Sequence, residues 1–195
     1  MLAAIMGLLV GVLSARAQSI LITINQYHPD AVTFTTTGNP AIVNDSSEFN
    51  LFGVDLVGYF TSGVTVAGSG ISGDLTPAGT TAPFNNWFTD NYLTTSNEDV
   101  NLYVNNSVQL QSFSTTLPAF TGSATINLAT FLADLPATGS SGPIYSGYSR
   151  NPGVQIGTWI VVPEPSSLAQ LGLGGLALVG IMAWRGRRGA FRSRV

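Results

Sequence analysis

The sequence predicts an all-β fold, an antiparallel β-sandwich of the jelly-roll-like kind, flanked by one apolar helix at each end. Short apolar or β-branched runs between residues 18 and 161 are broken by Gly, Pro, Asn and Asp, which is typical of such sandwiches. Only 9% of the residues are charged while Thr, Ser, Asn and Gly abound, a composition that suits neutral polar strand faces. Two long apolar stretches, residues 1–13 and 168–184, fall outside this pattern.

The strands are predicted from runs of β-branched and aromatic residues between turn signals. Residues 108–113 alternate between apolar and polar side chains with a period of two, the clearest strand signature in the chain. Gly- and Pro-rich breakers at 38–40, 68–73, 77–79 and 139–143 separate the runs, and residues 128–135 fit a short helix. The predicted strands are 20–24, 31–36, 49–56, 63–67, 100–104, 109–113, 124–128 and 157–161.

The first apolar stretch has the pattern of a cleavable signal peptide over residues 1–17. Its 13 apolar residues are too few to span a bilayer, and they are followed by small residues at Ala15 and Ala17. We therefore expect a signal peptidase to cut after Ala17. The alternative is a buried first helix of a soluble domain.

The second apolar stretch is predicted to be a single transmembrane helix over residues 168–184. Its seventeen residues reach about 25 Å, near the lower limit for a hydrocarbon core. The tail at 185–195 cannot follow it across, because each arginine costs about 2.5–3.5 kcal/mol at the membrane centre. The tail is thus expected in the cytoplasm and the body outside. The five arginines that stop transfer are Arg185, Arg187, Arg188, Arg192 and Arg194.

A Pro-Glu-Pro step joins the body to this helix. Pro163 and Pro165 lack an N–H and push the residues before them toward extended conformations, so the segment is expected to be an extended, solvated connector. Proteases bind extended chains, and Glu164 is the one charge there that an enzyme could recognise. The simpler alternative is a plain linker before a tail anchor.

Taken together, residues 162–195 resemble the PEP-CTERM sorting signal of Gram-negative bacteria. The resemblance rests on Val162, Pro163, Glu164, Pro165 and Ser166, on the Gly/Leu-rich helix, and on the arginine cluster, in that order. It implies recognition by an exosortase, a membrane-embedded transpeptidase-like enzyme, with processing near 163–165. It also implies an inner-membrane intermediate, later release to the cell surface or exterior, and association with exopolysaccharide and biofilm. The body between 78 and 161 resembles bodies of other PEP-CTERM proteins that have no assigned activity.

Composition excludes several classes of function for the body. Nine acidic residues stand against Arg150 alone between Gln18 and Val162, a formal charge of about −8, which repels nucleic-acid backbones. The chain has no cysteine, so disulfides, thiol nucleophiles and thiolate metal sites are excluded.

Few residues suggest chemistry. His28 is the one histidine, no nucleophile-elbow motif accompanies it, and it is interpreted as a surface loop residue. The glycines of 68–73 lack the lysine of a phosphate loop and are interpreted as a flexible turn. Two acidic clusters, 44–48 and 97–99, could hold Ca²⁺ through carboxylate oxygens, although neither has a known spacing and solvated loop charge is the simpler alternative. Carboxylates could also form a glycosidase pair.

Aromatic residues in polar loops are candidate glycan contacts, because exposed flat rings can stack on sugars. Buried core rings are the commoner case. The candidates are Trp87, Tyr92, Tyr145 and Tyr148.

Three functions follow from the sequence. We expect an exported, non-enzymatic surface or matrix protein without a cofactor, whose tail engages exosortase and whose body associates with exopolysaccharide. The alternatives are a carbohydrate-binding module and a glycan-active hydrolase.

Overall fold

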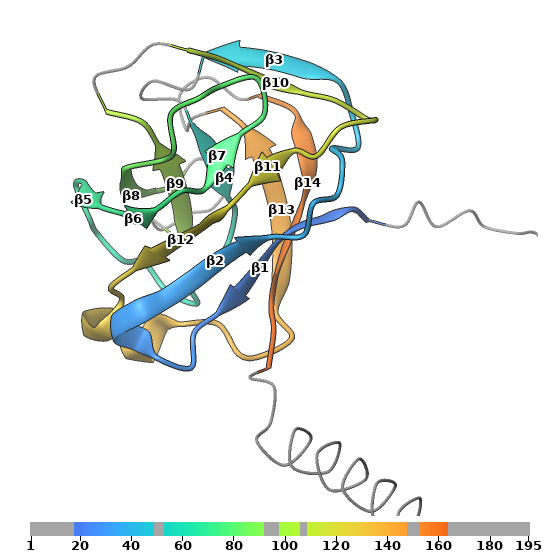
Figure 1. Cartoon of the computed structure of the whole chain (residues 1–195). Coiled ribbons are helices and arrows are strands. Elements are labelled where there is room, and N and C mark those ends of the chain that lie inside the picture. Colours follow the sequence, from blue (N-terminus) through green and yellow to red (C-terminus); the bar gives the residue numbers. More distant parts are fainter. Residues whose placement is uncertain (1–17, 49–52, 92–97, 106–108, 148–152, 164–195) are drawn as a thin grey trace, which may run out of the picture.

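The computed structural model of the chain describes residues 18–48, 53–91, 98–105, 109–147 and 153–163, which fold into a mostly β body (Figure 1). Its two short 3₁₀ helices are η1 (Pro29–Ala31) and η2 (Ala129–Asp134). The strands are β1 (Ile20–Asn25), β2 (Val32–Thr36), β3 (Asp45–Glu48), β4 (Val54–Leu56), β5 (Ser69–Gly70), β6 (Ser72–Gly73), β7 (Thr76–Pro77), β8 (Asn86–Asp90), β9 (Asp99–Tyr103), β10 (Leu110–Phe113), β11 (Phe120–Thr121), β12 (Ser123–Ile126), β13 (Ser141–Ser146) and β14 (Gln155–Val161).

Most of these strands belong to one ten-stranded sheet with the order β5-β8-β9-β4-β13-β14-β1-β2-β12-β6. Neighbouring strands run antiparallel except β1 and β14, which pair in parallel with Ile22 opposite Trp159. The first and last strands of the body are therefore neighbours in the middle of the sheet. Two small sheets, β3 with β10 and β7 with β11, complete the described body.

The large sheet curls until its two ends meet. Strands β5 and β6 stand at opposite ends of the strand order, yet Ile71 alone separates them along the chain. Ser69 pairs with Trp87 of β8, and Gly73 pairs with Ala124 of β12. One short segment thus bridges both edges, and β5 and β6 lie close together in Figure 1.

A single apolar core fills the curled sheet. Leu21, Ile22 and Ile24 of β1 are fully buried, as are Phe34 of β2 and Ile144 of β13. Aromatic rings cross the core edge to face, for example Tyr59 against Trp159 at 5.6 Å between ring centroids. This burial of large apolar side chains is the main stabilising contribution to the fold.

The predicted all-β class is confirmed, together with several elements. Strands expected at 20–24, 100–104, 109–113, 124–128 and 157–161 are present with shifted ends, and the helix expected at 128–135 is the 3₁₀ helix η2. The strand expected at 31–36 begins at Val32, after η1, and the one expected at 49–56 is described from residue 53, with Val54–Leu56 in β4. The two facing layers that a jelly-roll-like sandwich requires stay a prediction.

The prediction of a strand at 63–67 is wrong, because these residues form no strand in the structure. The hydroxyl of Thr89 donates to the carbonyl oxygen of Val64 and accepts from the N–H of Val66 at 2.9 Å. One backbone hydrogen bond to β8 remains, from the N–H of Thr89 to the carbonyl oxygen of Val66 at 3.2 Å, so a side chain makes contacts that a regular strand ladder would make. The strands that were not predicted are β3, β8 and β13 and the two-residue strands β5, β6, β7 and β11.

Within the described ranges, no helix has the length and apolar character needed to cross a membrane. The predicted signal peptide at 1–17 and the predicted membrane helix at 168–184 lie outside these ranges.

Candidate functional sites

Three aspartates from neighbouring strands meet inside the body. Asp90 of β8 lies opposite Asp99 of β9, and Asp55 of β4 lies opposite Asn101 of β9. Side chains two apart on a strand share a face, so Asp99 and Asn101 point the same way. The alternate residues Val100 and Leu102 point to the other face of β9 and belong to the apolar core. Strand β9 is buried on both faces, so this polar face is also shielded from water.

The three carboxylates are close together and almost inaccessible. One carboxylate oxygen from each lies within 4.8 Å of the others, and the exposed fractions of Asp55, Asp90 and Asp99 are 1%, 7% and 0%. The N–H of Gly58 donates to Oδ1 of Asp99 at 2.7 Å. Both oxygens of Asp55, in contrast, have no hydrogen-bond partner within the described residues.

Burial makes ionisation of Asp55 unfavourable. Desolvation is the largest cause, with the nearby Asp90 and Asp99 charges adding to it, and together they raise the pKa of Asp55 to about 9. All seven arginines fall outside the described ranges, and the chain has no lysine.

The donor set consists of oxygen atoms alone. The amide nitrogen of Asn101 donates to the carbonyl oxygen of Gly147 at 3.4 Å, and the amide oxygen adds a fourth oxygen to the face that carries Asp55 and Asp99. Carboxylate and amide oxygens are the ligands that hard cations prefer. A glycosidase pair would instead need carboxylates that a sugar can reach, and these are buried.

This cluster, the Asp55–Asp90–Asp99 cluster, was only partly predicted. Asp99 belongs to the acidic cluster expected at 97–99, whereas Asp55 and Asp90 were not singled out. The available signal was a charged residue inside an apolar strand, since Val54 and Leu56 flank Asp55.

The other acidic cluster expected, at 44–48, lies at β3. A shallow groove there is lined by Asn44, Asp45 and Ser46 with Ser112, Phe113 and Ser114. Asp45 is the one carboxylate among the described side chains that line this groove.

The aromatic candidates divide into three cases. Trp87 was expected as a candidate glycan contact, and this needs correction, because its exposed fraction is 2% and its ring packs edge to face on Phe131 at 6.4 Å. Tyr145 is half-buried on β13, opposite Asp55. Tyr92 and Tyr148 lie outside the described residues.

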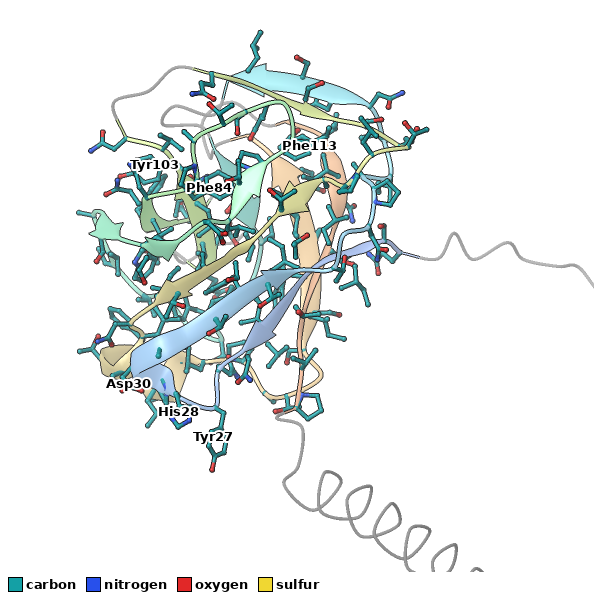
Figure 2. The ribbon with its side chains drawn as sticks, in the orientation of Figure 1. Tyr27, His28, Asp30, Phe84, Tyr103 and Phe113 are labelled. Carbon is teal, nitrogen blue, oxygen red and sulfur yellow. The ribbon has the colours of Figure 1, made fainter. Side chains whose placement is uncertain are left out.

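The two remaining candidates are His28 and the segment 68–73. His28 is exposed, as expected, and lies beside Tyr27 and Asp30 at the lower end of the body, with the Tyr27 and His28 rings edge to face at 4.9 Å (Figure 2). The segment 68–73 is not a plain flexible turn, because it carries β5 and β6, which bridge the edges of the sheet.

The C-terminal sorting segment begins where β14 ends. Val161 is the last residue of β14, and the N–H of Val162 still donates to the carbonyl oxygen of Ile24 in β1 at 2.9 Å. Pro163 is exposed and is the last described residue. The remaining predicted sites, from Glu164, Pro165 and Ser166 to the five arginines, and Ala15 and Ala17 at the other end, lie outside the described ranges.

Comparison with known families gives one match. Residues 161–188 match the family model of the PEP-CTERM protein-sorting motif. No curated protein and no solved structure matches the chain. The motif indicates an exported protein with exosortase as its processing partner and a membrane-anchored intermediate before release at the surface. The chain therefore carries a PEP-CTERM protein-sorting motif, which starts at the end of its last β-strand.

Proposed function

We propose that this protein is a non-enzymatic component of the cell surface or extracellular matrix, sorted by exosortase at residues 162–167 and associated with exopolysaccharide. The observation that carries the proposal is the match of residues 161–188 to the sorting motif, directly after β14.

The orientation in the membrane follows from the cost of moving charge through lipid. The segment 168–184 enters the bilayer, and the five arginines behind it stay in the cytoplasm because guanidinium groups are expensive at the membrane centre. A signal peptidase removes residues 1–17, so the body lies outside and is held by its C-terminal end until exosortase acts.

The positions of the two expected cuts support this route. Strand β1 begins at Ile20, shortly after Ala17, and β14 ends at Val161, before Pro163. Both cuts would leave every described strand within one piece, residues 18–162. A jelly-roll-like sandwich packing of this piece is part of the proposal.

The non-enzymatic role is supported by what the described residues offer. His28 is exposed, whereas the carboxylates of the Asp55–Asp90–Asp99 cluster are buried and a sugar cannot reach them from solvent. The carbohydrate-binding alternative loses one of its exposed rings, because Trp87 lies in the core.

Replacing Glu164 tests the sorting step. In Glu164→Ala we expect the protein to accumulate in the inner-membrane fraction at its unprocessed mass, because the charge that exosortase recognises is gone. The measurement is fractionation of the producing cells with immunoblotting of membrane and culture medium.

Asp30→Ala is the matched control, because Asp30 is an exposed acidic residue on η1, within the folded body. It should be processed and released like the unmodified chain. Normal release of the Glu164→Ala protein would contradict the proposed recognition.

A further inference from the structure

We propose that Asp55, Asp90 and Asp99 form a binding site for one Ca²⁺ ion, held between strands β4, β8 and β9. The proposal is independent of the sorting signal, because it concerns the folded body alone.

The separation of the carboxylates fits one shared ion. Ca²⁺ binds oxygen at 2.3–2.6 Å, so two oxygens on the same ion are at most about 4.6–5.2 Å apart. Oxygens from all three aspartates lie within 4.8 Å of one another. Separations in this range are compatible with one coordination shell shared by the three carboxylates.

Asp55 supplies a second and separate indication. Its exposed fraction is 1%, and neither of its oxygens has a hydrogen-bond partner within the described residues. Buried polar groups are nearly always paired, so an unpartnered carboxylate among two others indicates a missing positive ligand. A divalent cation at this point would partner the oxygens of Asp55.

The chemistry of the ligands selects the type of cation. Zinc prefers nitrogen and sulfur ligands, but the chain has no cysteine, and its one histidine, His28, is exposed and is not part of the cluster. Mg²⁺ is smaller and keeps several waters, which a buried site cannot easily accommodate. Ca²⁺ takes six to eight oxygens in flexible geometry, and Asn101 offers an amide oxygen on the same face.

The test measures the thermal stability of the full-length protein, purified in detergent and stripped with EDTA. At about 100 times its Kd, CaCl₂ should raise the melting temperature by about 5–10 °C, because it binds the folded state alone. MgCl₂ at the same concentration should have a smaller effect. Equilibrium dialysis with radioactive calcium should show one tightly bound ion per chain.

Substitutions identify the site. Asp55→Asn should abolish both the calcium-dependent shift and the bound ion, and Asp90→Asn provides the same test should Asp55→Asn fail to fold. Asp30→Asn, an exposed aspartate, and Asp45→Asn, in the groove at β3, are matched controls that should keep the full response.

The proposal is overturned if calcium leaves the unmodified protein unchanged, if Asp55→Asn and Asp90→Asn respond as the unmodified protein does, or if Asp45→Asn removes the response.

Discussion

At the scale of the residue, Asp55 is the most unusual position in the described body. A carboxyl group stands where the flanking Val54 and Leu56 would suggest a third apolar side chain. Burial alone favours its neutral form, and Asp90 from β8 and Asp99 from β9 reinforce this, while Tyr145 lies opposite it on β13. In the metal-free folded protein, the neutral form of Asp55 is therefore the favoured one.

In the metal-free protein, stability should fall as the pH rises. The pKa of Asp55 is about 9 in the folded state and 3.8 as the ordinary value, so between these pH values the folded chain holds a proton that the unfolded chain has lost. Each pH unit then costs at most about 1.4 kcal/mol of unfolding free energy. In EDTA, the melting temperature should be higher at pH 5 than at pH 8.

Asp55→Asn is the decisive comparison for this pH effect, because an amide cannot ionise. Its melting temperature should vary less between pH 5 and pH 8 than that of the unmodified chain. Equal slopes for the two proteins would show that Asp55 is not the titrating group.

Sequence reasoning reached only part of this site, for a physical reason. Asp99 was found because it lies in an acidic run, but Asp55 and Asp90 join it only through the register of β4, β8 and β9. No local pattern specifies which strands become neighbours. Trp87 shows the reverse case, because its polar sequence neighbours suggested a loop while strand pairing places it in the core.

At the scale of the element, β13 shows how a glycine can be required inside a strand. Gly142 pairs with Trp159 of β14, whose indole N–H donates to the carbonyl oxygen of Val57 at 3.2 Å. A Cβ on Gly142 would lie 2.5 Å from that oxygen and 2.7 Å from Nε1 of Trp159. Because Gly142 has no side chain, the indole N–H of Trp159 can reach the carbonyl oxygen of Val57.

Gly142→Val should destabilise the body by about 2–4 kcal/mol, because overpacking and loss of the indole hydrogen bond outweigh the higher strand propensity of valine. The measurement is urea unfolding followed by tryptophan fluorescence. Gly70→Val is the matched control, since a Cβ on Gly70 would have no atom within 4 Å, and its effect should stay within about 0.5 kcal/mol. A similar loss in both variants would contradict the role given to Gly142.

The same residue explains why β13 escaped prediction. Gly142 and Pro143 together indicate a turn, and proline is rare in central strands because it lacks an N–H. In the structure Pro143 contributes its carbonyl oxygen, which accepts from the N–H of Val57 at 3.1 Å. The strands at 20–24 and 157–161 were predictable because β-branched and other apolar residues make up most of these runs.

At the scale of the whole molecule, the body is acidic and nearly free of basic groups. Its contacts with a polysaccharide would have to be made by hydroxyl and amide groups, because one arginine cannot form a basic patch. We expect the released protein to be retained on exopolysaccharide isolated from the producing cells, with little loss at high salt, in a pull-down assay. A dextran matrix is the control. Passage through both matrices alike would contradict the association.

The curled sheet itself lay beyond sequence reasoning. Residues 68–73 were interpreted as a flexible turn, and only the pairing of β5 with β8 and of β6 with β12 reveals that they join both ends of the sheet. Very short edge strands of this kind also leave little backbone open to pairing with another chain.

The position of β14 has a consequence for the order of events during export. This strand inserts between β13 and β1, and it is the last part of the body to emerge before the sorting motif. The sheet therefore cannot be completed while its final strand is still being threaded outward. We therefore expect the last strand to become available for pairing only just before the sorting motif does.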